Sequence, residues 1–119
     1  MKVLVVDDSG VMRKIIIRSL NAVGVSDIVE AGDGQEGFVQ FQAHQFDLVL
    51  TDWNMPVRNG LEFVTDIRKT GSKVPIMMIT TEGQRSQVIL AIQAGVTDYL
   101  VKPFEKESLR AKLDKYVPV

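Results

Sequence analysis

Side chains that can do chemistry stand directly after four short apolar runs of the sequence. In chain order they are Asp7-Asp8, Thr51-Asp52, Thr80-Thr81 and Lys102-Pro103. If the runs are strands of one parallel sheet, these side chains leave it at the edge where ligands bind in doubly wound folds. Each residue alone has an ordinary structural explanation, because Asp and Thr cap helices and Lys is usually solvated. Together they predict a site with three carboxylates, a hydroxyl and an ammonium.

The carboxylates of Asp7, Asp8 and Asp52 predict a divalent metal. Carboxylates this close together repel unless a cation lies among them. Mg²⁺ binds one or two carboxylates, keeps several waters and accepts phosphate oxygens, whereas a Ca²⁺ site needs more protein oxygens than this edge offers. Zinc is disfavoured, because the chain has no cysteine and a single histidine, His44, which we expect at the surface. The predicted cofactor is therefore Mg²⁺.

An aspartate beside Mg²⁺ and a lysine can also act as a nucleophile toward phosphorus and form an aspartyl phosphate. Metal and ammonium then neutralise the phosphoryl oxygens, and a hydroxyl from the next strand can hydrogen-bond to the attached group. Asp52, Lys102 and Thr80 are the candidates for these roles.

Strands and helices in alternation must position these residues. Apolar runs rich in β-branched residues predict five buried strands at Val3–Val6, Ile28–Val29, Phe46–Leu50, Ile76–Ile79 and Tyr99–Val101. Four stripes at helical spacing would each cover one face of the sheet: Met12, Ile15, Ile16, Leu20 and Val23; Leu61, Val64 and Ile67; Val88, Ala91 and Ile92; Leu109, Leu113 and Tyr116. A further helix is expected from Gln35 to Ala43, although Gly37 interrupts it.

Capping signals agree with this division. Ser9 can cap the first helix, and Asp33 with Glu36 three residues later resembles a capping box for the second. Helix ends are predicted at three glycines, which are Gly24, Gly71 and Gly95. The alternation predicts an α/β fold with a doubly wound parallel sheet, in one domain over residues 1–119.

The overall charge excludes some classes of partner. Fourteen Lys and Arg stand against fifteen Asp and Glu, so no net positive charge favours nucleic acid or an anionic membrane. The absence of cysteine excludes disulfides and thiolate chemistry. No uncharged stretch approaches the roughly 18 residues that a membrane span needs. We therefore expect a cytoplasmic protein, and a monomer.

With these residues in place, the sequence resembles the receiver domain of two-component response regulators, and among them the stand-alone chemotaxis receivers. The resemblance covers nearly the whole chain, and the matching segments are Val5-Val6-Asp7-Asp8-Ser9, Met12-Arg13, Asp52-Trp53-Asn54-Met55-Pro56, Asn59-Gly60, Thr80, Ala94-Gly95, Tyr99 and Lys102-Pro103-Phe104. The family's flavodoxin-like fold implies five helices and the strand order 2-1-3-4-5.

The resemblance implies a role for each site residue. Asp52 would accept a phosphoryl group from a sensor histidine kinase, with the carboxylates of Asp8 and Asp52 and the backbone carbonyl of Asn54 on Mg²⁺. Asp7 would act on the metal through water. Lys102 would contact the phosphoryl group, and the Lys102-Pro103 bond would be cis.

The resemblance also implies an output. Thr80 would close on the phosphoryl group while Tyr99 changes rotamer, which alters a partner-binding surface around Arg85, Ile89, Tyr99, Lys106 and Lys112. The downstream partner would be the flagellar motor switch protein, and a phosphatase is a further expected partner. Alternatively, Tyr99 lies at the surface with its hydroxyl in water.

Two positions depart from the family pattern. Thr81 carries an extra methyl group where the family usually has Ala, Gly or Ser, and with Glu82 it stands where side chains can crowd or orient the hydrolytic water. Arg58 occupies a position where an apolar residue is common.

Other classes remain open at this stage. An aspartate-nucleophile phosphatase would need a second Asp two residues after the nucleophile as general acid, but that residue is Asn54. We therefore expect a phosphoacceptor with self-catalysed transfer and autodephosphorylation, not an enzyme that acts on external esters. A flavodoxin-type electron carrier is disfavoured, because Asp7-Asp8 would repel a cofactor phosphate. The chain can also be a receiver cut from a larger transcriptional regulator, with Val117-Pro118-Val119 as the start of a linker, or a receiver that is never phosphorylated.

Overall fold

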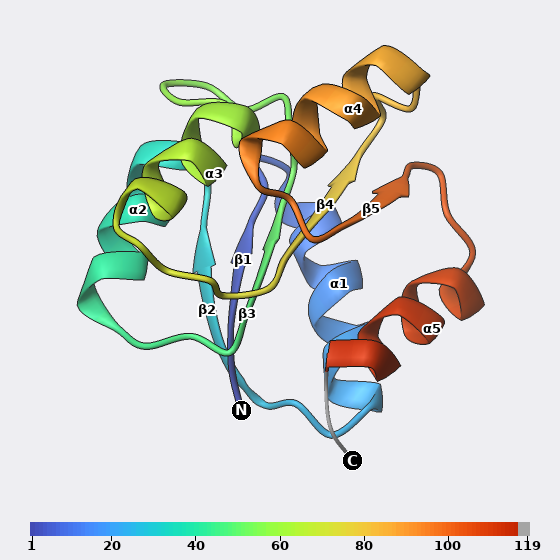
Figure 1. Ribbon diagram of the computed structural model, residues 1–119. Coiled ribbons are helices and arrows are strands. Elements are labelled where there is room, and N and C mark those ends of the chain that lie inside the picture. Colours follow the sequence, from blue (N-terminus) through green and yellow to red (C-terminus); the bar gives the residue numbers. More distant parts are fainter. Residues whose placement is uncertain (117–119) are drawn as a thin grey trace.

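The structure is a computed structural model in which residues 1–116 are described, and it has a parallel sheet between two layers of helices (Figure 1). Val117-Pro118-Val119, the candidate linker, lies outside the described residues. In chain order the elements are β1 (Lys2–Val6), α1 (Gly10–Ala22), β2 (Asp27–Ala31), α2 (Gly34–Ala43), β3 (Leu48–Thr51), α3 (Gly60–Lys69), β4 (Ile76–Thr80), α4 (Arg85–Ala94), β5 (Asp98–Val101) and α5 (Lys106–Tyr116).

The strand order is β2-β1-β3-β4-β5, with all neighbours parallel, so the predicted fold class is confirmed. The prediction of five buried strands is wrong for the two edges. β1, β3 and β4 are buried apart from Lys2, whereas β2 is mostly exposed or half-buried and the last residue of β5, Val101, is exposed. An edge strand has a neighbour on one side only, so less of it is covered.

The sheet separates two apolar cores because successive side chains of a strand point to opposite faces. From β1, Val3 and Val5 join the core under α1 and α5, while Leu4 and Val6 join the core under α2, α3 and α4. Figure 1 shows the same division of the helices. Helices on both faces fix the strand positions, and thereby the edge at which the polar residues meet.

The predicted helical stripes are partly correct. Leu20, Ala91 and Leu109 are fully buried as expected, but Ile92 is 58% exposed. One step along a helix turns the side chain by about 100°, so a helix that buries Ala91 against the sheet directs Ile92 outward. Phe63, absent from the predicted stripe of α3, is fully buried.

The predicted caps are confirmed with one correction. Ser9 accepts a hydrogen bond from the Met12 amide at 3.2 Å, and Asp33 accepts one from the Glu36 amide at 2.8 Å. The Glu36 carboxylate, however, accepts from the Gly32 amide, so the box around Asp33 is not reciprocal. The three glycines predicted at helix ends have positive φ, from 88° to 115°.

A complete capping box is found where none was predicted, at the start of α3. The amide of Asn59 donates to Glu62 at 3.0 Å, and the amide of Glu62 donates to Asn59 at 2.9 Å. Strand β3 also begins two residues later than predicted, because Phe46 packs with its ring beside Phe41 and His44 instead of entering the sheet.

Candidate functional site

The strand order brings together residues at the carboxyl ends of four strands. Asp7 follows β1, Asp52 follows β3, Thr80 ends β4 and Lys102 follows β5. These four strands are neighbours in the sheet, and their carboxyl ends lie at one edge. The bond between Lys102 and Pro103 is cis, as the resemblance implied.

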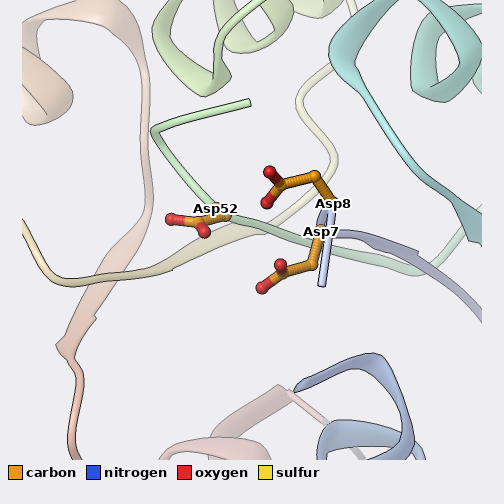
Figure 2. Close-up of side chains that lie close together, drawn as sticks. All are labelled: Asp7, Asp8 and Asp52. Atoms are coloured by element: carbon orange, nitrogen blue, oxygen red, sulfur yellow. The ribbon is translucent and has the colours of Figure 1, made fainter. Parts of the chain in front are cut away.

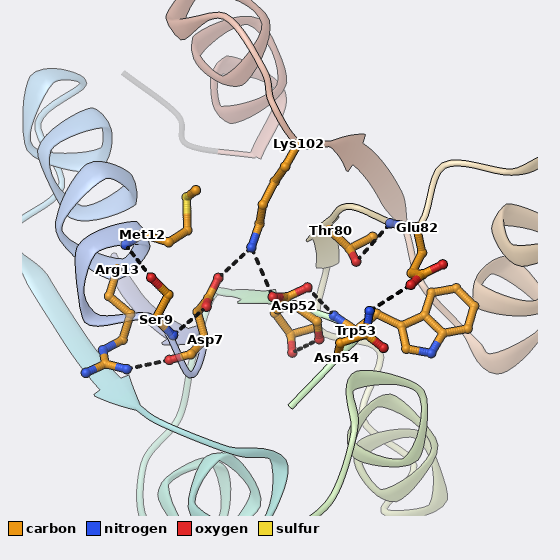
Figure 3. A network of polar contacts seen from close by, with 11 residues as sticks. Asp7, Ser9, Met12, Arg13, Asp52, Trp53, Asn54, Thr80, Glu82 and Lys102 are labelled. Carbon is orange, nitrogen blue, oxygen red and sulfur yellow. Dashed lines mark hydrogen bonds and ion pairs between the residues drawn. The ribbon is translucent and has the colours of Figure 1, made fainter. Parts of the chain in front are cut away.

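Lys102 lies between two buried aspartates. Its Nζ donates to Oδ2 of Asp7 at 3.0 Å and to Oδ2 of Asp52 at 3.0 Å, across 95 and 50 residues of sequence (Figure 3). The side chains of Lys102, Asp7 and Asp52 are 12%, 2% and 10% exposed. Ion pairs so shielded from water orient their partners more firmly than surface pairs do.

A third carboxylate completes an acidic group. Carboxylate oxygens of Asp7, Asp8 and Asp52 lie within 4.8 Å of one another, and Asp8 is exposed where the other two are buried (Figure 2). With all three ionised, one ammonium leaves two negative charges at the site. Such a donor set fits a hard divalent cation that is reached from solvent.

The pKa values at the site reflect both burial and pairing. Burial raises the pKa of Asp7, and this effect outweighs the hydrogen bonds from the Ser9 amide and from Lys102 that lower it. For Lys102, burial would lower the pKa, but the hydrogen bonds to Asp52 and Asp7 outweigh burial and raise it. Lys102 therefore stays an ammonium at neutral pH, while ionised Asp7 is held at a cost in free energy that a bound cation reduces.

The remaining contacts orient the Asp52 carboxylate and its surroundings. Oδ1 of Asp52 accepts from the Trp53 amide at 2.6 Å, so the two oxygens have different partners. Thr80 is fully buried, and its hydroxyl oxygen accepts from the Glu82 amide at 3.2 Å. The Asn54 side-chain amide donates to Glu82 at 2.8 Å, a contact that sequence reasoning did not predict.

The donor chemistry fits Mg²⁺. All side-chain ligands at the edge are carboxylate oxygens, which Mg²⁺ prefers, and the exposed position of Asp8 leaves room for the waters that this ion retains. Asp7, Asp8 and Asp52 are the side chains that would hold it. The backbone carbonyl of Asn54 stays a prediction.

Tyr99 has its hydroxyl inside the protein. The side chain packs against the core under α4, and its hydroxyl is buried with no hydrogen-bond partner among the described residues. The alternative that placed this hydroxyl in water is therefore wrong for this structure. Burial, together with Glu82 and Asp52, raises the pKa of Tyr99 to about 12.

The other predicted output residues are only partly brought together. Arg85 begins α4 and is exposed, as are Ile89 and Thr81. Lys112 pairs with Asp98 of β5 at 2.8 Å. Lys106, by contrast, lines a groove between α1 and α5.

Two further groups were missed by the sequence reasoning. Asp98 accepts hydrogen bonds from Lys112 at 2.8 Å and from the Tyr116 hydroxyl at 2.9 Å, which fasten α5 to β5. Arg13 contacts both the Asp7 backbone and Glu30. Arg13 belongs to the segment Met12-Arg13 that matches the receiver family, but no local pattern of the sequence predicted its partners.

The described residues contain no helix long and apolar enough to cross a membrane.

Comparisons with known proteins give consistent results. Residues 3–114 match the family described as the response regulator receiver domain. The chain is 47% identical over 117 residues to the chemotaxis protein CheY1 of Helicobacter pylori, covering 96% of this chain and 94% of that relative. It is 45% identical to the CheY homolog of Campylobacter jejuni, covering 96% and 90%. The solved structure of the chemotaxis response regulator CheY4 of Vibrio cholerae superposes with a TM-score of 0.89 at 36% identity, over 98% of both chains.

Proposed function

Because the chain belongs to the response regulator receiver domain family, we propose that residues 1–119 form one receiver that a sensor histidine kinase phosphorylates on Asp52, with Mg²⁺ as cofactor. The observation that carries this proposal is the position of Lys102, whose ammonium lies 3.0 Å from carboxylate oxygens of both Asp7 and Asp52. A lysine beside the Asp52 carboxylate can neutralise an oxygen of a phosphoryl group that is attached there.

The proposed reaction uses one carboxylate oxygen of Asp52 as the nucleophile. A new P–O bond forms to Asp52, the bond from phosphorus to the kinase histidine nitrogen breaks, and the histidine leaves with the electron pair. Mg²⁺, when bound, supplies positive charge at the phosphoryl oxygens. The Trp53 amide and Lys102 hold the two oxygens of Asp52, so the carboxylate is oriented before the phosphoryl group arrives.

In the proposed autodephosphorylation, water hydrolyses the aspartyl phosphate at the same site. A new P–O bond forms to a water oxygen, the bond from phosphorus to the Asp52 oxygen breaks, and the products are the Asp52 carboxylate and inorganic phosphate, with the protons of the water passing to phosphate and solvent. Thr81 is exposed directly after β4, and Glu82 beside it accepts a hydrogen bond from Asn54, two residues after Asp52; in this proposal these side chains limit or orient that water. Asn54 cannot donate and recover a proton as an acidic residue does, which argues against turnover of external phosphate esters.

The proposed output surface includes α4 and β5. The buried Thr80 hydroxyl and the inward Tyr99 lie on neighbouring strands, so a shift of Thr80 toward a phosphoryl group changes the space available to Tyr99. A phosphoryl group moves this equilibrium only by its differential affinity for the two states. The names of the relatives indicate chemotaxis, so the proposed downstream partner is the flagellar motor switch protein, with a phosphatase as a further partner and the cytoplasm as location.

A receiver cut from a larger regulator would use the same chemistry with a different output. The length of the natural open reading frame distinguishes it from a stand-alone chemotaxis receiver.

Intact-mass measurement tests the phosphorylation. We expect one phosphoryl adduct after incubation with Mg²⁺ and acetyl phosphate, and none in Asp52→Asn or with chelator present. The control is Asp66→Asn, which should still form the adduct. In the native protein Asp66 is partly exposed and pairs with Arg58, not with a residue of the site. An adduct that survives Asp52→Asn, or that forms equally with chelator, would contradict the proposal.

A further inference from the structure

Arg13 connects the loop after β1, which carries the proposed metal ligands Asp7 and Asp8, to strand β2. From α1, its Nη1 donates to the backbone carbonyl of Asp7, and its Nε donates to Oε1 of Glu30 on β2 at 3.0 Å. Figure 3 shows the guanidinium beside Asp7. The Arg13 side chain is 24% exposed, so the contact with Asp7 is shielded from much of the solvent.

The contact with Arg13 satisfies the last polar group of Asp7. The Asp7 amide donates to the Ala31 carbonyl at 3.1 Å, and its carboxylate accepts from the Ser9 amide at 2.9 Å and from Lys102 at 3.0 Å. Asp7 is only 1% exposed with Arg13 in place, and the guanidinium is the donor that its carbonyl contacts. Without this charged donor the carbonyl must turn to water or to another donor, and a rotation of the peptide group allows it to do so.

That peptide group also carries Asp8. The carbonyl of Asp7 and the amide of Asp8 share one rigid plane. By holding the carbonyl, Arg13 fixes the direction in which Asp8 leaves β1 toward Asp52. Lys102 and Ser9 hold the Asp7 side chain but do not fix Asp8, which is exposed.

We propose that Arg13, held by Glu30, is a positioning residue that sets the affinity of the site for Mg²⁺ through the Asp7–Asp8 peptide. This inference rests on the proposed function, because it assumes that Asp7, Asp8 and Asp52 bind the metal. Partners that orient metal ligands from outside the coordination shell typically change metal affinity by about 10- to 100-fold.

Position and charge make opposite predictions for Arg13. If its positive charge were what mattered, removal of Arg13 would strengthen Mg²⁺ binding, because a cation near the site repels the metal. If its position matters, removal weakens binding. The guanidinium donates to the backbone of Asp7 and forms its ion pair with Glu30, outside the three carboxylates of the site, so we expect the positioning effect to dominate.

The first test measures Mg²⁺ affinity in Arg13→Ala. We expect the dissociation constant, from calorimetric titration with MgCl₂ at constant ionic strength, to rise about tenfold. The thermal midpoint gained on adding Mg²⁺ should fall accordingly. Arg18→Ala is the matched control: it removes the same charge from an exposed position further along α1, in the groove against α5, and should keep native affinity.

The second test separates the two effects at Glu30 and does not depend on the stability of the Arg13 variant. Glu30→Gln removes the charge but keeps an oxygen that can accept from Arg13, so we expect near-native Mg²⁺ affinity. Glu30→Ala frees the guanidinium and should weaken binding. If the role of Glu30 were purely electrostatic, both variants would bind Mg²⁺ equally weakly.

The outcomes are distinguishable from failure of the proposed function. If native protein does not bind Mg²⁺, the proposed function fails. If native protein binds Mg²⁺ and Arg13→Ala binds as tightly or more tightly, or if the two Glu30 variants weaken binding equally, only the role of Arg13 is overturned.

Discussion

Gly60, the first residue of α3, lies against the backbone of the proposed phosphoacceptor. A Cβ atom at Gly60 would stand 2.0 Å from the carbonyl oxygen of Asp52 and 2.8 Å from Cα of Trp53. The Gly60 amide also donates to the Trp53 carbonyl at 2.7 Å. The close approach, not an unusual φ, is what requires glycine, so Gly60→Ala must push α3 away from the strand end.

The expected loss follows from these contacts. Ordinary van der Waals contacts of a Cβ atom begin near 3.4 Å, so the backbone must move by more than an ångström, and no flexible side chain can take up the change. Overpacking of this kind costs about 1–3 kcal/mol, and a weakened backbone hydrogen bond adds about 1 kcal/mol. We expect Gly60→Ala to lose about 3 kcal/mol of unfolding free energy, or about 10 °C in thermal midpoint.

Gly10→Ala is the matched control. Gly10 also begins a helix, but a Cβ there would meet only the end of the Arg13 side chain, at 3.7 Å. Urea unfolding should show no loss of stability for Gly10→Ala, and a gain of up to about 1 kcal/mol from the helix preference of alanine. At a temperature where both variants are folded, phosphorylation from acetyl phosphate should slow in Gly60→Ala alone, since Asp52 is displaced.

Equal urea midpoints for the two variants would refute this reasoning about backbone contact. Native phosphorylation by folded Gly60→Ala would refute the link between α3 and the orientation of Asp52.

Three further predictions concern the metal, the signal and the stability of α5. Trp53 donates its amide to Asp52, so Mg²⁺ alone should change its fluorescence, and a flat titration in protein shown by calorimetry to bind Mg²⁺ would contradict this. Thr80→Ala should leave phosphorylation of Asp52 largely intact but weaken the gain in partner affinity that beryllofluoride produces; an equal gain in native protein and variant would show that Thr80 does not transmit the signal. Burial would raise the pKa of Asp98, but its hydrogen bonds to Lys112, to an adjacent amide and to a tyrosine hydroxyl outweigh burial and lower the pKa below 3.8. The folded state therefore binds fewer protons, and this stabilisation is present above pH 3.8 and lost as the pH falls through the folded pKa. Asp98→Asn should lower the free energy of unfolding by about 1 kcal/mol at pH 7 and reduce its dependence on pH in the acid range. Urea unfolding of native protein and variant at pH 7, and at the lowest pH where both fold, measures the difference in unfolding free energy. The same difference at both pH values would contradict the linkage.

The local pattern of the sequence was sufficient to predict the alternation of strands and helices. Side chains repeat with a period of two in strands and 3.6 in helices, and caps such as Ser9 and Asp33 act on the next turn only. The same local information placed Asp7, Asp52, Thr80 and Lys102 at strand ends. The strand order, however, came from the resemblance to a family, since periodicity does not say on which side of β1 the next strand is added.

Tertiary structure decided what these residues do to one another. The exposure of β2 and of Val101 depends on which strands are at the edges, and the outward direction of Ile92 depends on how α4 rests on the sheet. The bridge from Lys102 to Asp7 joins residues 95 positions apart. The hydrogen bonds of Arg13 to Asp7 and to Glu30 connect α1 with the loop after β1 and with β2. The local periodicity of the sequence does not predict such contacts, because they form only when the strands lie side by side in the sheet with their carboxyl ends at one edge.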